Sequence, residues 1–186
     1  MPPASVMSIV CAAMRLVSLA ALVLIALALE PALRAEGDGM VDLGLVAVNG
    51  VQLGSLRSQV VATFGEPRSV RRGRDTELGV GRWEAMDFGG LVIKVTVPEP
   101  GMMKSPPPEP YVYSYLVTGS RWMTQAGVRI GNTMKQVIAR LGPPAFEQAR
   151  DGGTLVHYFI RGKDSYAAIL LREGRVVSIR VFEDWS

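Results

Sequence analysis

One segment of eighteen residues occurs twice in this chain of 186 residues. Residues 50–67 (GVQLGSLRSQVVATFGEP) align without gaps on residues 127–144 (GVRIGNTMKQVIARLGPP), at an offset of 77, and eight of the eighteen pairs are identical. An internal repeat indicates that one structural unit is present in more than one copy. The sequence therefore predicts two tandem units, the first in residues 36–120 and the second in residues 121–186.

Each copy of the repeat has the pattern of a short helix. Ser55 and Asn132 are residue types that cap the start of a helix. Apolar residues then recur at helical spacing, as Leu56, Val60 and Phe64 in the first copy and Met134, Ile138 and Leu141 in the second. A glycine ends each helix and a proline follows two positions later. The positions that define the unit are Gly54, Gly65 and Pro67, with Gly131, Gly142 and Pro144 as their counterparts.

The segments after each predicted helix are rich in β-branched and aromatic residues, and turn residues such as Gly89 and Gly90 separate them. The expected strands are Trp83–Phe88, Leu91–Val97 and Tyr111–Thr118 in the first copy, and Leu155–Ile160, Tyr166–Arg172 and Val176–Glu183 in the second. The predicted fold is α+β, with two tandem α-βββ units whose short helices pack on one face of an antiparallel sheet.

The two copies differ between their last two strands. The first copy carries the segment Pro98–Pro110, which holds six of the twelve prolines in the chain. Such a composition favours a polyproline II extension that a partner could bind. The alternative is an exposed insertion that the fold merely tolerates.

The N-terminal region has the pattern of an export signal. Residues 16–29 form an uncharged run of fourteen residues, with Arg15 before it and Glu30 after it. This length fits the apolar core of a signal peptide better than a spanning helix. We expect residues 1–35 to be a cleaved signal peptide and the mature protein to be periplasmic or secreted; an N-terminal membrane anchor is the alternative.

The remaining composition argues against several classes of function. The net charge of +3 is too small to predict nucleic-acid binding. Cys11, the only cysteine, precedes the apolar run, so we expect no thiol chemistry in the mature chain. His157 is the only histidine and lies in a strand pattern, where a structural role is the simpler interpretation. We therefore predict no enzyme activity, no cofactor and no metal site, although a carboxylate-dependent hydrolase remains an alternative.

Aromatic residues supply the candidate protein-binding site. Tyr111, Tyr113 and Tyr115 alternate along one expected strand and would share a face, with Trp83 and Trp122 nearby in sequence. Tyrosine and tryptophan are enriched where proteins bind one another. If these tyrosines form an interface, exchanging Tyr113 and Tyr115 for alanine should weaken binding and preserve stability. The alternative is that they are core.

A second candidate site is a cluster of four arginines in an expected loop after the first helix. Its members are Arg68, Arg71, Arg72 and Arg74. Such a cluster could bind an anionic membrane surface, lipid headgroups or an acidic protein. The alternative is a solvated charge cluster without a ligand.

The pattern of Gly-x-Ser/Asn turn, short helix ending in Leu/Phe-Gly-x-Pro, and three strands with the late turn Arg172-Glu-Gly-Arg175 resembles the SmpA/BamE-like family of outer-membrane assembly lipoproteins. Two copies in one chain are also similar in architecture to the β-lactamase inhibitor protein. The resemblance implies non-enzymatic protein binding in an envelope or extracellular setting. A lipid-modified cysteine after the signal run is absent here, so membrane anchoring is not implied.

Together these observations predict an exported, non-enzymatic module that binds another envelope or secreted protein, as an assembly factor or inhibitor. The alternative is a protein that binds anionic surfaces or lipid headgroups through the segment from Arg68 to Arg74.

Overall fold

The structure is a computed structural model that describes residues 38–75, 81–97, 109–150 and 152–184. The predicted signal peptide lies outside these residues, as does the segment Pro98–Pro110 except for its last two residues. Residues 37–186 belong to one compact unit. In the described part of the chain, no helix has the length and hydrophobicity needed to span a membrane.

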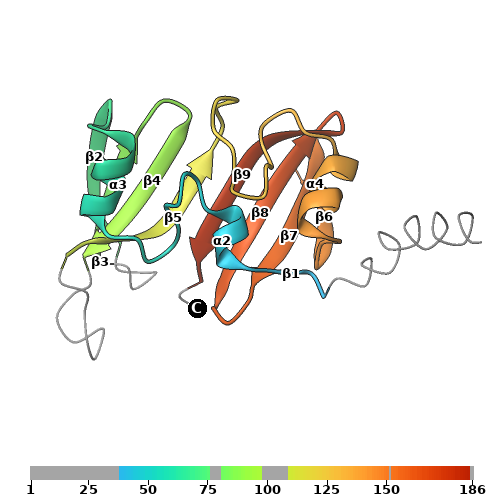
Figure 1. The fold of residues 1–186 in the computed structure, drawn as a ribbon, viewed down its shortest axis with the longest axis horizontal. Helices are drawn as coiled ribbons and strands as arrows, with labels where there is room; N and C mark the ends of the chain where they lie inside the picture. Colours follow the sequence, from blue (N-terminus) through green and yellow to red (C-terminus); the bar gives the residue numbers. More distant parts are fainter. Residues whose placement is uncertain (1–37, 76–80, 98–108, 151, 185–186) are drawn as a thin grey trace, which may run out of the picture. The chain divides into compact units, whose positions relative to one another are not determined.

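The described residues form three helices and nine strands (Figure 1). The helices are α2 (Leu43–Val46), α3 (Arg57–Phe64) and α4 (Met134–Leu141). The strands are β1 (Met40–Val41), β2 (Ser69–Asp75), β3 (Gly81–Asp87), β4 (Leu91–Val97), β5 (Tyr111–Val117), β6 (Phe146–Arg150), β7 (Gly153–Ile160), β8 (Ser165–Arg172) and β9 (Arg175–Glu183).

All nine strands join one sheet. Its order is β1-β7-β8-β9-β5-β4-β3-β2, and β6 also pairs with β7. The short β1 runs parallel to β7, whereas the other pairs are antiparallel, so the sheet is mixed. Figure 1 shows β2 to β5 on one side of the seam between β5 and β9, and β6 to β8 beyond β9.

The predicted fold class of two α-βββ units is wrong. Four strands rather than three follow α3, and four follow α4, and all strands share one mixed sheet. The missed strands are β2, which contains Arg71, Arg72 and Arg74, and β6, all of whose residues are exposed. Neither has a run of apolar residues, because a strand near a sheet edge need not bury both faces.

The two copies of the repeat nevertheless have the same local backbone. Helices α3 and α4 lie 77 residues apart and have eight residues each. The N–H of Gly54 donates to the carbonyl oxygen of Val112, and the N–H of Gly131 donates to that of Val176, with both bonds near 2.8 Å. Gly65 and Gly142 end the helices with φ of 76° and 84°, a conformation that favours glycine.

The seam between β5 and β9 relates the two copies by an approximate two-fold axis. Because Val112 and Val176 are equivalent, Leu116 of β5 corresponds to Arg180 of β9, and these two residues are paired with each other. The neighbouring pairs show the same symmetry. Tyr115 pairs with Val181, and the symmetry-related pair is Val117 with Ile179. The axis therefore passes through the pair of Leu116 and Arg180, at the middle of the sheet.

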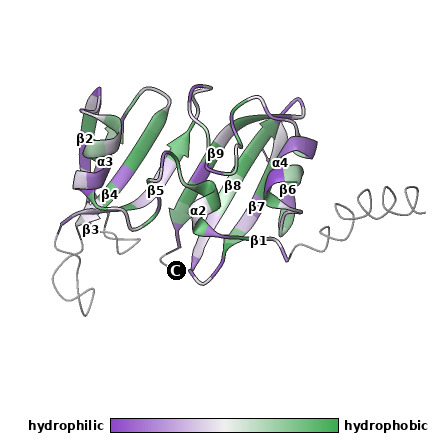
Figure 2. Ribbon diagram, viewed as in Figure 1, coloured by the Kyte–Doolittle hydropathy of each residue, from purple (hydrophilic) through white to green (hydrophobic). Residues whose placement is uncertain are grey.

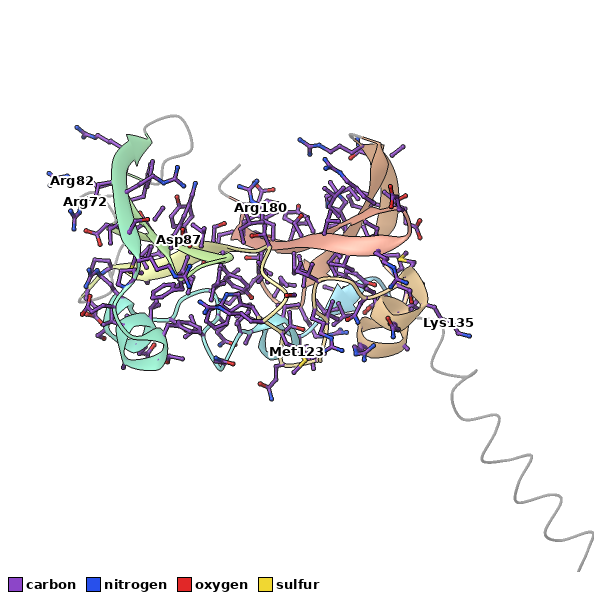
Figure 3. The ribbon with its side chains drawn as sticks, turned by 90° about the horizontal axis from the view of Figure 1, so that it is seen from above. Arg72, Arg82, Asp87, Met123, Lys135 and Arg180 are labelled. Atoms are coloured by element: carbon purple, nitrogen blue, oxygen red, sulfur yellow. The ribbon has the colours of Figure 1, made fainter. Side chains whose placement is uncertain are left out.

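One face of the sheet carries α3 and α4, and the core lies beneath them. Figure 3 shows these helices on one side of the sheet and the side chain of Arg180 on the other. The buried residues alternate along the strands, as Leu91, Ile93 and Val95 do in β4. Figure 2 shows the corresponding hydrophobic colouring along β4 and β8. We call the opposite side the helix-free face.

The predicted helix caps lie one residue too early. The helices begin after Leu56 and Thr133, and the Thr133 hydroxyl oxygen accepts a hydrogen bond from the N–H of Gln136. The side chains of Ser55 and Asn132 instead accept from backbone N–H groups of the preceding turns, at Gln52 and Arg129. The predicted apolar stripe of the second helix is also partly wrong. Val137 is fully buried, whereas Ile138 is exposed.

Candidate binding face

The register of the second copy places a set of side chains on the helix-free face. Phe146 pairs with His157, His157 with Ala168, and Ala168 with Arg180. A parallel line joins Phe159, Tyr166 and Phe182 across β7, β8 and β9. Directly paired residues project from the same face of a sheet. Both lines therefore lie on the face that Arg180 marks in Figure 3.

Five rings on this face contact one another in sequence. Phe146 stacks on His157 with ring centroids 4.3 Å apart, and it lies 6.2 Å from Phe159. Phe159 lies 5.3 Å from Tyr166, which lies 5.7 Å from Phe182. These separations are typical of favourable aromatic pairs. We call these five residues the aromatic row.

The aromatic row is partly exposed to solvent. Phe146 is 45% exposed and Phe159 is 37% exposed, although both are large apolar side chains. A hollow of about 480 Å³ opens beside Phe159 and Tyr166, with Met40 and Lys163 also in its wall. Contiguous exposed aromatic groups mark interaction surfaces more often than isolated ones do.

Positive groups flank the aromatic row. The Arg180 guanidinium lies over the Phe182 ring at 5.0 Å, within the range of a cation–π contact. Burial, together with the positive charge of Arg150, lowers the pKa of His157 below its ordinary value. The Nε2 atom of His157 is buried and has no hydrogen-bond partner among the described residues. The row therefore combines apolar rings with a cationic side chain and an imidazole.

The three candidate tyrosines are buried and do not form an open interface. Tyr115 is 1% exposed and belongs to the main core, where its hydroxyl donates to the carbonyl oxygen of Val46. Tyr111 and Tyr113 are also buried and form a small separate cluster with Leu56 and Trp83. Desolvation is the main reason that the pKa of Tyr111 rises to about 12. The structure thus favours the core interpretation of these residues.

A β-bulge explains why the tyrosines do not share a face. The pairing of β4 with β5 shifts between Lys94 and Val95, so that Tyr113 has no direct partner in β4. One extra residue in a strand reverses the alternation beyond it. Tyr115 therefore points into the core, whereas the small cluster holds Tyr111.

The two candidate tryptophans lie in different surroundings. Trp83 is half-buried against the backbone of Gly73, and the Lys94 ammonium lies 5.2 Å from its ring centroid. Trp122 packs edge-on against Phe64 and donates a 3.0 Å hydrogen bond from Nε1 to the carbonyl oxygen of Gly89. The structure does not bring the five predicted residues together into one site.

The predicted arginine loop is in fact a strand. Because side chains alternate along β2, Arg71 projects from the face opposite to Arg72 and Arg74. The Arg72 side chain donates to Glu84 at 2.7 Å, and Arg57 of α3 donates to the same carboxylate at 3.0 Å. Arg68 lies against Gly89 at the end of the strand. The four arginines therefore do not converge on one anion.

Sequence reasoning missed four members of the aromatic row, namely Phe146, Phe159, Tyr166 and Phe182. A usable signal was present, since Leu155, His157 and Phe159 alternate with the apolar Val156, Tyr158 and Ile160. Such a pattern predicts a strand with large side chains on both faces. In the described part of the chain, no three histidine, cysteine, aspartate or glutamate side chains cluster as a metal site would require.

No family model matches the chain, and no curated protein matches it. Among solved structures, it is similar to an extracellular protein containing a SCP domain from Bacillus anthracis, with a TM-score of 0.44, 14% identity, and coverage of 72% of this chain and 44% of the other. It is also similar to a cysteine-rich secretory protein from Staphylococcus aureus, with a TM-score of 0.44, 14% identity, and coverage of 77% and 48%.

A third similar structure is a DUF4309 family protein from Bacillus subtilis, with a TM-score of 0.43, 14% identity, and coverage of 72% of this chain and 82% of the other. The chain spans less than half the length of the first two proteins. At such identity and TM-scores, these likenesses carry no argument about activity or partners. None of the three is an SmpA/BamE-like lipoprotein or a β-lactamase inhibitor protein. The family resemblance inferred from the repeat is wrong, because no family model matches the chain and its strands form one mixed sheet in place of two α-βββ units.

Proposed function

We propose that this chain is a non-enzymatic binding protein that recognises another protein through the aromatic row. The observation that carries the proposal is the exposure of Phe146 and Phe159 within a continuous set of ring contacts. Large aromatic side chains on a rigid sheet lose little conformational entropy when a partner covers them. The helices lie on the other face and leave the row accessible (Figure 3).

The setting of this function belongs to the same proposal. The uncharged run in residues 16–29 supports export, which would place the binding protein in the cell envelope or outside the cell. The partner would then be another envelope or secreted protein. A binding role is supported by the make-up of the row, because clustered aromatic rings supply the kind of contact area that protein interfaces use.

Site-specific photo-cross-linking in the cells that make the protein tests this proposal. A photoreactive amino acid replaces Phe159 in one variant and Ile138 in another, since both side chains are 37% exposed but Ile138 lies on α4, on the opposite side of the sheet. We expect a discrete cross-linked protein from position 159 and none from position 138. Equal products from both positions, or none from position 159, would contradict the proposal.

A second variant separates binding from folding. Replacing Phe146 and Phe159 with serine removes exposed surface and should leave the melting temperature within a few degrees of the parent. The same change should abolish the cross-link from a photoreactive residue placed at Tyr166. Persistence of that cross-link would show that the partner does not depend on Phe146 and Phe159, the residues whose exposure carries the proposal.

A further inference from the structure

Arg180 lies at the centre of the helix-free face. It is paired with Leu116 on one side and with Ala168 on the other, and the approximate two-fold axis passes through the first of these pairs. Both neighbours are uncharged and smaller than the arginine side chain. Residues near the centre of an interface contribute most to affinity, because a partner excludes water from them completely.

Arg180 is exposed, and none of the ion pairs among the described residues includes it. Its contact is with the face of the Phe182 ring at the end of the aromatic row. An arginine stacked on a ring keeps its N–H donors in the plane of the guanidinium, where they can still bind a carboxylate at two points. The arginine is therefore held in place while its hydrogen-bonding groups remain available.

Other positively charged side chains lie on the same face as Arg180. Arg71 and Lys94 project from the same face in the first copy, and Arg150 lies beyond His157 at the other edge. Asp87 is the carboxylate that the register places on this face of β3, at the end of that strand, and its Oδ1 atom accepts a hydrogen bond from the N–H of Gly89. A ligand of this face thus meets apolar rings beside cationic groups.

We infer that the partner is an acidic protein surface that places a carboxylate on Arg180 and apolar side chains on the aromatic row. The inference rests on the proposed function and names the chemistry of its partner. Complementary charge would accelerate association and select the correct orientation. Removal of the Arg180 charge should weaken binding by about tenfold, as expected for a charge-assisted contact at the centre of an interface.

Selection from a displayed random-peptide library against the full chain tests this inference. Peptides that bind the parent protein should combine aspartate or glutamate with aromatic or aliphatic residues. The Arg180→Gln variant should lose the acidic preference and bind a selected peptide about tenfold more weakly. The control is Lys135→Gln, which removes one positive charge from the exposed surface of α4, away from this face (Figure 3).

The possible outcomes separate the inference from the proposed function. If selected peptides require Phe159 but show no acidic preference, the inference fails and the proposed function stands. If no selected peptide is lost in the Phe159→Ser variant, the proposed function fails. A single-stranded oligonucleotide probe is included because rings and cations also bind nucleic acids. Binding of that probe through Arg180, more tightly than any acidic peptide, would overturn the inference.

Discussion

The hydroxyl of Tyr115 donates a 2.8 Å hydrogen bond to the carbonyl oxygen of Val46, and this bond connects β5 to α2 inside the core. Tyr115 is almost completely buried, and burial raises its pKa far above the ordinary value. The ring and its hydroxyl therefore belong to the fold and not to a binding surface.

Replacing Tyr115 with phenylalanine should lower the free energy of unfolding by about 1–2 kcal/mol, because a buried carbonyl loses its donor. Replacement with alanine should lower it by about 3–5 kcal/mol through the cavity that remains. Denaturant unfolding measures both changes. The control is Tyr166→Phe, since Tyr166 lies on the helix-free face; a loss in that variant as large as in Tyr115→Phe would contradict this assignment.

Glu84 connects α3 to the edge of the sheet through Arg57 and Arg72. The hydrogen bond from Arg72 is the main reason that the pKa of Glu84 is lowered. Because the folded-state pKa lies below the unfolded value of 4.5, the stabilisation is complete above that value and is lost as the pH falls through the folded-state pKa.

Replacing Glu84 with glutamine should therefore destabilise the protein by about 1 kcal/mol at neutral pH. The difference from the parent should shrink below pH 4.5, and thermal melting at several pH values measures it. A difference that stays constant across this range would mean that the carboxylate charge contributes nothing.

His157 should make the protein less stable in mild acid. Its pKa is lowered by burial and by the Arg150 charge, so the folded protein favours the neutral ring. Stability is then complete above the unfolded value of 6.5 and is lost as the pH falls from there towards the lower folded-state pKa. NMR titration of the ring protons measures this pKa directly. We expect Arg150→Gln to raise it, and no change in that variant would contradict the proposed role of the charge.

Gly39 should resist substitution more strongly than Gly54, although both have positive φ. A Cβ atom at Gly39 would overlap the backbone of Ala145, and its φ is 67°. At Gly54 the φ is 83°, but a Cβ atom would meet open space. Gly54→Ala should therefore lower the free energy of unfolding only through backbone strain, by about 1–2 kcal/mol.

Gly39→Ala should lower the free energy of unfolding by more than Gly54→Ala does. The carbonyl oxygen of Gly39 accepts a hydrogen bond from the N–H of Phe159, and displacement of the Gly39 backbone would loosen β1 from β7. Comparison of the two melting temperatures tests the difference. Equal losses in both variants would show that contact with Ala145 is unimportant.

Much of the strand pattern could be predicted from the sequence, because apolar residues alternate where one face is buried. Leu91–Val97 is an example: Leu91, Ile93 and Val95 are all buried, and Gly89 and Gly90 form the turn before them. Strand β2 could not be predicted in this way. Its arginines have no apolar alternation, and it is held by backbone pairing with β3 and by the contact of Arg72 with Glu84.

The candidate site was harder to predict because its position depends on register. The bulge at Tyr113 arises from the pairing of β4 with β5. The spacing of the tyrosines in the sequence gives no sign of it. The aromatic row likewise exists only because β6 to β9 align Phe146 with His157 and Phe159 with Tyr166. A sequence shows which side chains alternate, but not which neighbours they meet across strands.

The seam between β5 and β9 consists of four paired positions, from Ser114 with Phe182 to Val117 with Ile179. We expect so short a junction to act as a pivot between Trp83 and Lys94 in one copy and the rings of the other. Exchanging a core residue such as Ile179 for a bulkier one would change the twist at this pivot and thus the spacing of the outer groups. Natural variation at such core positions could change which ligand binds without changing any residue that contacts the ligand.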